Sequence, residues 1–199
     1  MDPLDSALVL GSSQPASVVD ASECSKAGIS VVRRRSGGGA VLVRPGGQLW
    51  VDFLVPSGDP LWDADVGRAA WWLGELWAGA LSSIGVPGAT VWKAPLFRRP
   101  WSSLACFALL GAGEVTLGTV AGPVLGPPKV VGISQRRTRA GALFQCSCLL
   151  SWEPRELVAL LAVAGEEAEN AARDLGSVAV PVPAGKGGQL LEALLADLP

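Results

Sequence analysis

The sequence predicts an α+β fold in which a mixed, largely antiparallel sheet packs with helices. Strand-like stretches separated by glycine and proline dominate the first 150 residues, whereas the apolar spacing becomes helical after Pro154. The chain has 199 residues, 49% of them hydrophobic, and shows no repeat, so one domain with a sizeable core is expected. We therefore expect a single domain over 1–199, with a motif-bearing sheet region over 7–150 and a helical part over 151–199.

Short strands and breakers alternate in the first part of the chain. The expected elements are a strand over 6–11, a loop over 12–17, a short helix over 19–28, a strand over 29–34 and a hairpin over 40–56. The turn of that hairpin contains Pro-Gly-Gly. Its second arm alternates in side-chain direction from one residue to the next, which is the period of a strand.

Helices and strands are mixed in the rest of the chain. Asp63 or Asp65 caps a helix that runs to about Ser83, where Gly85 and Pro87 end it. The remaining expected elements are strands over 89–95, 103–110 and 113–120, a breaker-rich connection over 121–128, two strands around an arginine-rich turn within 129–150, and helices over 155–176 and 188–198.

The composition excludes several kinds of chemistry and of partner. With no histidine, the chain lacks the usual near-neutral acid/base and the commonest metal ligand. The net charge is only −2, yet nine of the twelve arginines fall within 33–44, 98–99 and 136–139. Such clustering indicates a local anion site, whereas a nucleic-acid binder usually has a broader basic face. We therefore expect no nucleic-acid partner.

The N-terminus and the apolar runs bear on the compartment. The first ten residues are acidic and lack the basic region and cleavage site of a secretory signal. Arg68 and Glu75 interrupt the most membrane-like run, 67–85, so no membrane span is expected. A cytoplasmic protein whose four cysteines are reduced thiols is predicted.

Three consecutive glycines, Gly37–Gly39, follow the predicted strand over 29–34 and three arginines. Bare main chain lets amide groups approach a ligand, and successive amides form a concavity that binds a phosphate or carboxylate. The adjacent arginines add fixed charge and bidentate donors. A glycine-rich hairpin or bulge with a solvated arginine edge is the alternative. Neither G-x-x-x-x-G-K-[ST] nor a G-x-G-x-x-G that opens a helix is present.

Lys129 is one of only four lysines and begins a predicted strand that continues to Gly132. A lysine inside a sheet is costly unless its ammonium meets an anion. The alternative is a lysine on an edge strand that points to water.

Taken together, these segments resemble the catalytic-domain family of lipoate–protein ligases, octanoyltransferases and biotin–protein ligases. Residues 33–41 match the family's Arg-Arg-x-x-Gly-Gly-Gly-Ala-Val loop if Arg33 and Arg34 are the pair, and residues 129–137 match its Lys-[Ile/Val]-x-Gly-x-[Ala/Ser]-Gln-Arg-Arg segment. Residues 8–14 and 104–115 are similar to two further family segments. The resemblance covers about 7–150 and is closer to the lipoyl branch than to the biotin branch.

The resemblance implies a catalytic domain like those of class II aminoacyl-tRNA synthetases, and an enzyme that attaches a lipoyl or octanoyl group to a lysine of a carrier domain. The carrier domains belong to 2-oxo-acid dehydrogenase or glycine-cleavage complexes. By the same resemblance, Lys129 stabilises charge on the acyl carbonyl oxygen. The residues that would hold the acyl-adenylate or acyl chain are Arg33, Arg34, Gly37, Gly38, Gly39, Ala40, Gly132, Ser134 and Gln135.

Two mechanisms fit the family. A ligase uses ATP and Mg²⁺ to activate lipoate or octanoate, whereas a transferase takes octanoate from acyl carrier protein through a cysteine thioester. Cys146, which shares one strand face with Cys148, is the candidate thiol, and beside Lys129 and the arginines its pKa is expected to be low. Both cysteines could instead be small buried hydrophobic residues. Without a C-x-x-C pairing or a histidine, we predict no metal site.

Two departures from the family pattern shape the alternatives. Members usually carry an extra helix and strand before the position of Leu8, and stand-alone ligases commonly carry a C-terminal accessory domain. We therefore expect that the N-terminal family segment is missing, and that the accessory domain is a separate chain or that a transferase does without it. A third hypothesis is a non-catalytic relative that binds an acyl group or a nucleotide.

Overall fold

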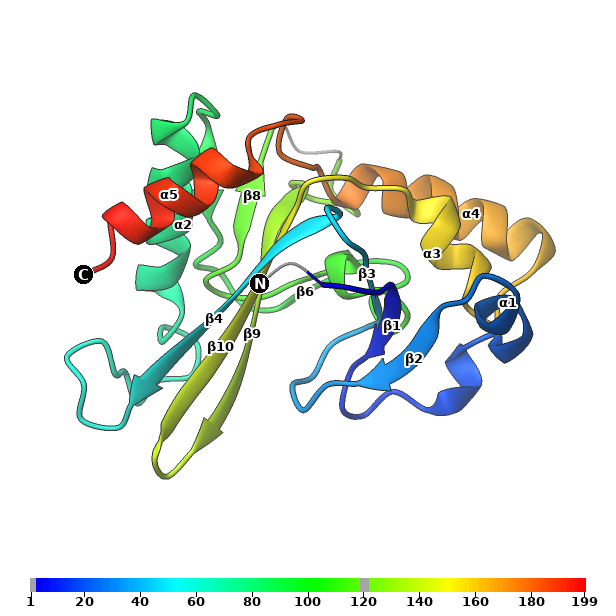
Figure 1. The fold of residues 1–199 in the computed structure, drawn as a ribbon, viewed down its shortest axis with the longest axis horizontal. Helices are drawn as coiled ribbons and strands as arrows, with labels where there is room; N and C mark the ends of the chain where they lie inside the picture. Colours follow the sequence, from blue (N-terminus) through cyan, green and yellow to red (C-terminus); the bar gives the residue numbers. More distant parts are fainter. Residues whose placement is uncertain (1–2, 119–121) are drawn as a thin grey trace.

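The computed structural model describes residues 3–118 and 122–199, and the predicted α+β architecture is confirmed. Within these residues the largest sheet is antiparallel throughout (Figure 1). Its strands, in spatial order, are β4 (Gln48–Pro56), β10 (Gly141–Leu149), β9 (Lys129–Thr138), β8 (Val115–Leu117) and β5 (Ala89–Val91).

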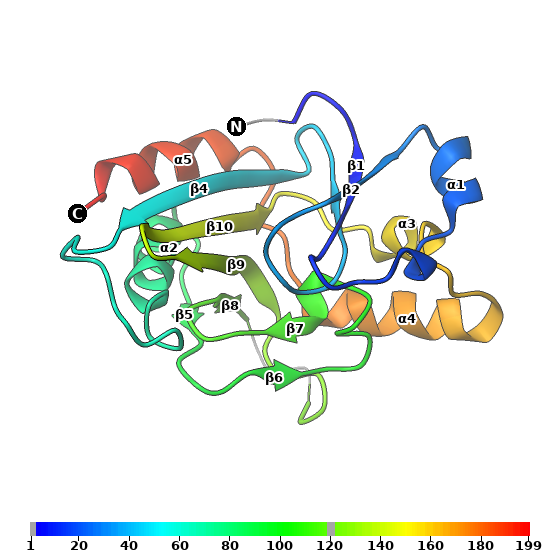
Figure 2. The same cartoon turned by 90° about the horizontal axis from the view of Figure 1, so that it is seen from below.

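A second, smaller sheet lies beside the large one, as Figure 2 shows. Its order is β2 (Ser30–Arg33), β1 (Ala7–Leu10) and β3 (Val41–Val43), with β1 parallel to β2 and antiparallel to β3. A short ribbon of β6 (Phe97–Arg98) and β7 (Leu109–Leu110) accompanies them. The small sheet is therefore mixed, and the large sheet is antiparallel.

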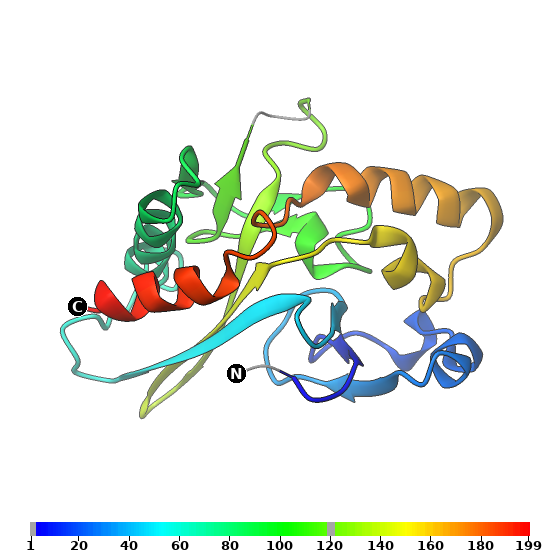
Figure 3. The ribbon, with the colours of Figure 1, turned by 45° about the horizontal axis from the view of Figure 1, so that its top comes forward.

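Two large cores hold the helices against the sheets, and a small third cluster contains Phe107, Leu149 and Ala179. Helices α2 (Trp71–Ser83) and α5 (Gly187–Ala196) cover one face of the large sheet (Figure 3), where Leu73, Trp77 and Leu190 are buried. The other core joins the small sheet to α1 (Ala21–Lys26), α3 (Pro154–Ala159), α4 (Gly165–Val178) and the 3₁₀ helices η1 (Ala16–Val18) and η2 (Cys106–Ala108). The face of the large sheet opposite α2 is thereby left to line a site together with the small sheet.

The predicted hairpin over 40–56 is wrong. Its two arms exist as β3 and β4, but Val43 pairs with Ala7 in the small sheet and Gln48 pairs with Leu149 in the large one. The turn between them, closed by a hydrogen bond from Gly47 N to Arg44 O, carries the chain from one sheet to the other. A turn signature predicts that the chain reverses but does not predict which strand each arm pairs with.

Three further boundaries differ from the prediction. The helix expected from residue 63 or 65 begins only at Trp71, because the carboxylates of Asp63 and Asp65 instead accept hydrogen bonds within turns. The strand expected over 89–95 shortens to β5. Of the strand expected over 103–110, only β7 is extended and Cys106–Ala108 form η2, whose Cys106 and Phe107 carbonyls accept from buried side chains.

The helix predicted over 155–176 is interrupted. Between α3 and α4 the chain is extended, and Leu160 O and Ala162 N bond to the backbone of Asp20 and Val18. The short helix over 19–28, the strands over 6–11 and 29–34, the hairpin within 129–150 and the final helix are confirmed. Of the strand over 113–120, β8 is present and residues 119 and 120 lie outside the described residues. No helix in the described ranges is long and apolar enough to cross a membrane.

Candidate active site

Every second residue of β4 and β10 points to the same side of the sheet, and these residues build one wall of the site. Trp50 pairs with Ser147, and Gln48 pairs with Leu149, and these residues lie on the sheet face opposite the one that packs on α2. The facing wall comes from the glycine loop, β3 and η2. The cavities between these walls therefore depend on segments far apart in the sequence.

Three hollows follow one another along this wall. The first, which we call the outer groove, has a cavity volume of about 290 Å³ and is lined by Val9, Val32, Arg33, Arg34, Val43, Trp50 and Gln145. The second, the neck, is a constriction of only about 20 Å³ and is lined by Arg34, Val41, Trp50, Cys106, Phe107, Gly132, Ile133, Ser134, Gln145 and Ser147.

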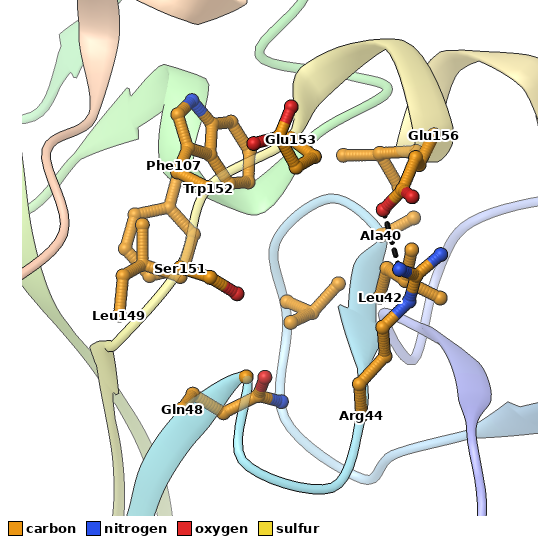
Figure 4. Close-up of a pocket in the computed structure, with 13 residues that line it drawn as sticks. Ala40, Leu42, Arg44, Gln48, Phe107, Leu149, Ser151, Trp152, Glu153 and Glu156 are labelled. Atoms are coloured by element: carbon orange, nitrogen blue, oxygen red, sulfur yellow. Dashed lines mark ion pairs between the residues drawn. The ribbon is translucent and has the colours of Figure 1, made fainter. Parts of the chain in front are cut away.

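The third hollow, which we call the wide cavity because it is wider than the neck, has a cavity volume of about 120 Å³ and extends from Ala40–Leu42 to α3 (Figure 4). It shares Val41 and Phe107 with the neck, which in turn shares Arg34, Trp50 and Gln145 with the outer groove. The three hollows therefore adjoin in sequence, with the neck in the middle.

The glycine loop is seated against η2. A Cβ added at Gly39 would lie 2.5–2.8 Å from backbone atoms of Ala105 and Cys106, so only glycine fits there. Within the described residues, the amides of Gly37, Gly38 and Gly39 donate no main-chain hydrogen bond. The three glycines line none of the three hollows, whereas Arg34 before them and Ala40 after them do.

Ser36, the residue before the glycines, ties the loop to the large sheet. Its hydroxyl donates to Gln145 Oε1 and accepts from Ser134 Oγ, both at 3.1 Å. These bonds cross the neck from the loop to β9 and β10. Ser134 therefore lies in the wall of the neck.

The two motif arginines donate hydrogen bonds to main-chain carbonyls, Arg34 to those of the glycine loop and Arg33 to those of the segment after β1. Arg33 donates to the Gly11 and Gln14 carbonyls at 2.7 and 2.5 Å. Arg34 donates to the carbonyls of Gly37 and Gly39 at 2.7 and 2.9 Å. Because a guanidinium keeps its charge when its hydrogens are bonded, Arg34 still presents positive charge to the neck.

Lys129 lies one layer behind the neck wall. Its side chain is 0% exposed, and its Nζ lies 3.0 Å from each carboxylate oxygen of Glu114 and 3.1 Å from Cys106 O. A bulge where β8 pairs with β9 places Val130 in the core, so Lys129 points away from that core. The ammonium therefore lies between the large sheet and η2 without lining any of the three hollows.

Gly132 is the thinnest part of the wall in front of this ammonium. A Cβ added there would lie 3.6 Å from Glu114 Oε1 and 3.8 Å from Lys129 Nζ, which are ordinary contact distances. Gly132 itself lines the neck. Only the main chain of this glycine separates the neck from the buried Lys129–Glu114 pair, and we call this thin place in the wall the Gly132 window.

Cys146 is not on this face, and the expected low thiol pKa is wrong. Its neighbour Gln145 faces the neck, so Cys146 points into the core with Trp77. Desolvation there raises the pKa of the Cys146 thiol well above its usual value, and raises that of Cys148 to about 12. The thiol that does line the neck is Cys106, whose Sγ lies 3.8 Å from Arg34 Nη2.

Gln135 and Ala40 complete the predicted set. Gln135 Nε2 donates to Val66 O at 2.7 Å, in a surface groove that also contains Trp71, so the structure separates Gln135 from Ser134. Ala40 is buried and lines the wide cavity. Of the predicted residues, five line the neck or a hollow beside it: Arg33, Arg34, Ala40, Gly132 and Ser134. The others, Gly37–Gly39, Gln135, Cys146 and the recessed Lys129, line none of the three hollows.

Comparison with known families decides the relationship. Residues 4–182 match the family model described as the lipoyl protein ligase A/B catalytic domain. The chain belongs to this family. A search of curated proteins found no match.

Solved structures of lipoate ligases share the fold. A bipartite lipoate protein ligase of Thermoplasma acidophilum, studied with its E2 lipoyl domain, superposes with a TM-score of 0.71 at 21% identity, covering 96% of this chain and 66% of that one. Lipoate-protein ligase A bound with ATP gives 0.57 at 18% identity, with 97% and 78% covered. LipL1 of P. falciparum with lipoate gives 0.61 at 14% identity, with 96% and 46% covered. The chain thus spans less than two thirds of the length of the first and last of these proteins.

This lipoyl protein ligase A/B domain contains site residues that the motifs did not indicate: Glu114, Cys106, Gln48 and Arg99. Glu114 is a single carboxylate in an apolar stretch, and the need of a buried Lys129 for an anion could have indicated it. Arg99 is buried, donates to the Phe107 and Val178 carbonyls, and has its pKa lowered to about 10 by desolvation. No sequence signal distinguished Cys106 or Gln48.

Metal ligands are a separate matter for this family member. Among residues 3–118 and 122–199, no group of three or more cysteine, aspartate or glutamate side chains could hold an ion.

Proposed function

We propose that the protein is a lipoate–protein ligase-like enzyme that transfers a lipoyl or octanoyl group to a lysine of a carrier domain. The observation that carries this proposal is the series of three adjoining hollows with a charged neck in the middle. An acyl-adenylate has the same order: an apolar chain, an anionic mixed anhydride and a nucleotide.

Each hollow suits one part of such a ligand. The outer groove offers Val9, Val32 and Val43 to an aliphatic chain. The neck offers the Arg34 charge to a phosphate. The wide cavity offers Phe107 and Trp152 to a flat base. Related structures of lipoate ligases contain ATP or lipoate, which supports this assignment.

The chemical step proposed is attack of a carrier lysine amine on the acyl carbonyl in the neck. The bond from the acyl carbon to the phosphate oxygen breaks, AMP leaves, and the amine loses its proton. The Lys129 ammonium, through the Gly132 window, stabilises the negative charge that develops on the carbonyl oxygen. Fixed-charge stabilisation of this kind is worth about 3–4 kcal/mol. To reach that oxygen, Lys129 exchanges one of its carbonyl partners for it.

The decisive assay measures the mass of an apo lipoyl domain after incubation with the protein, ATP, Mg²⁺ and lipoate or octanoate. We expect the carrier lysine to gain the acyl group. A parallel reaction includes a separately supplied accessory domain, because a related ligase is described as bipartite. No mass gain under any of these conditions, although binding is seen by calorimetry, would favour the non-catalytic binding relative.

The Gly132 window gives this proposal a specific variant. Gly132→Ala introduces a methyl group at ordinary contact distances, at a glycine that does not have a positive φ, so the fold should be retained. We expect acyl transfer to fall at least tenfold, because the methyl group separates Lys129 from the neck. Circular dichroism and thermal unfolding provide the control, and unchanged turnover would contradict the role of the window.

A cysteine-dependent octanoyltransferase is the second candidate, and the position of Cys106 favours it. Its thiol lies in the neck beside Arg34, where an acyl carbonyl would lie in the first proposal. This form predicts transfer from octanoyl acyl carrier protein without ATP and an octanoyl adduct on Cys106, which Cys106→Ser abolishes. Cytoplasmic location stays a prediction that both forms share.

A further inference from the structure

Gln48 lies in the wide cavity with a buried amide that has no partner. The residue is 4% exposed, and its Nε2 makes no hydrogen bond to any described residue. Buried donors of this kind are uncommon, because the lost hydration is not replaced. Figure 4 shows the Gln48 side chain at the border of the cavity, with Arg44 on one side and Ser151 across from it.

The direction of this donor is set by the sheet. Gln48 is the first residue of β4 and pairs with Leu149, while the preceding carbonyl, Gly47 O, accepts from the amides of Leu150 and Ser151. The residue before Gln48 and the cross-strand partner of Gln48 are thus both held in place. Gln48 lies on the same face of β4 as Trp50, so its side chain points to the side of the sheet that carries the three hollows.

The rest of the cavity suits a flat ring. Phe107 and Trp152 form an aromatic pair with centroids 5.6 Å apart, and Leu42 and Leu157 add apolar walls. An ion pair between Arg44 and Glu156 lies along the remaining side (Figure 4). Ser151 and Glu153 also line the cavity, and Gln48 Nε2 is the buried donor without a partner among its described lining residues. Apolar walls with a few placed polar groups are typical of a site that binds an aromatic heterocycle and reads its edge.

We infer that Gln48 recognises the nucleobase: its Nε2 donates a hydrogen bond to a ring nitrogen of adenine in the wide cavity. The inference rests on the proposed function, because it takes the nucleotide of the acyl-adenylate as the occupant. Gln48 is then a specificity-determining residue that acts on nucleotide affinity and leaves the acyl end of the site untouched.

The test measures binding by calorimetry with Mg²⁺–ATP and, separately, with octanoate. Gln48→Leu should raise the Kd for ATP about tenfold, the usual value of one neutral hydrogen bond, and leave the Kd for octanoate unchanged. The matched control is Gln189→Leu, which makes the same change at an exposed position on α5. The melting temperature of unliganded Gln48→Leu should not fall, because no protein hydrogen bond is lost.

Deaza analogues of ATP, in which one ring nitrogen is replaced by C–H, identify the acceptor. Wild type should lose about tenfold affinity for one of the 1-, 3- or 7-deaza forms, and Gln48→Leu should lose nothing further for that analogue. If ATP binds but Gln48→Leu binds it as tightly as wild type, or the variant melts at a much lower temperature, the inference is overturned and the ligase proposal stands. If wild type binds no ATP, the ligase proposal fails first and this inference falls with it.

Discussion

The Lys129 ammonium and the Glu114 carboxylate form an ion pair with almost no solvent contact: the exposed fractions of the side chains are 0% and 7%. Burying two charges is expensive, and the pair is tolerated because hydrogen bonds from the Gly111 and Ile133 amides and to the Cys106 and Leu109 carbonyls satisfy both groups. Removal of either partner leaves the other charge buried and uncompensated.

Lys129→Met alone is therefore expected to lower the free energy of unfolding by about 3–5 kcal/mol, and a loss of activity in that variant would say little about catalysis. The double variant Lys129→Met/Glu114→Gln removes both charges and should recover most of the stability in urea unfolding. It should still lose acyl transfer. A stable double variant with normal turnover would exclude Lys129 from the reaction.

The buried thiols predict a loss of stability at alkaline pH. The pKa values of Cys146 and Cys148 are raised in the folded state from an unfolded value near 9.0. Below pH 9 the two thiols are neutral in both states, and their contribution to the free energy of unfolding is complete. Above pH 9 the thiols ionise in the unfolded chain but not in the folded one, so this contribution is lost as the pH rises. We expect each thiol to reduce the free energy of unfolding by about 1.4 kcal/mol per pH unit between pH 9 and 11.

Comparison with Cys146→Ala/Cys148→Ala isolates this effect, because other groups titrate equally in both proteins. The variant should show a flatter dependence on pH, and parallel curves would contradict the burial of these thiols. In the native wild type, Cys106 should be alkylated before either of them.

At the scale of elements, the glycine loop depends on its contact with η2. Gly39→Ala would bring a methyl group within 2.5 Å of Ala105 and must displace one of the two segments. Overpacking of this kind usually costs about 1–3 kcal/mol. Gly37→Ala, two residues earlier, meets nothing within 4 Å and is the matched control. Thermal unfolding should separate the two variants, and equal melting temperatures would show that the loop does not rest on η2.

Elements whose pattern is local could be predicted from the sequence. The β9–β10 hairpin is one case, because its turn and both arms lie within one stretch of chain. Helix α1 is another, with Asp20 accepting from Ser22 N and Glu23 N at its start. The break between α3 and α4 could not be predicted, because its cause is a backbone pairing with residues 18–20, far away in sequence.

At the scale of the whole molecule, the cavities join two separately packed cores. Val41 and Leu42 come from the small sheet, Gln48 and Leu149 from the large one, and Leu157 from α3. Only the folded chain brings these residues together, so a ligand that contacts all of them binds the folded protein and not the unfolded chain.

Ligand binding should therefore stabilise the protein globally. At a hundred times the Kd, ATP or octanoate is expected to add about 2.7 kcal/mol to the free energy of unfolding, seen as a rise in melting temperature. Sodium triphosphate serves as the control for charge alone. Turnover without any stabilisation by either ligand would contradict a site formed between the two cores.

The sequence by itself determined the family, the α+β class, and the motif residues of the glycine loop and of β9, because these depend on residue type and short-range spacing. Only the tertiary structure decided which side of the sheet each of them faces. The alternation of side chains along β10 and β9 points Cys146 and Gln135 away from the neck. A bulge between β8 and β9 points Lys129 toward Glu114. The turn at 44–47 carries the chain from the small sheet to the large one and so brings Gln48 to the wide cavity. The physical reason is that strand pairing and register are set by contacts between distant segments, and one residue of register reverses the face to which a side chain points.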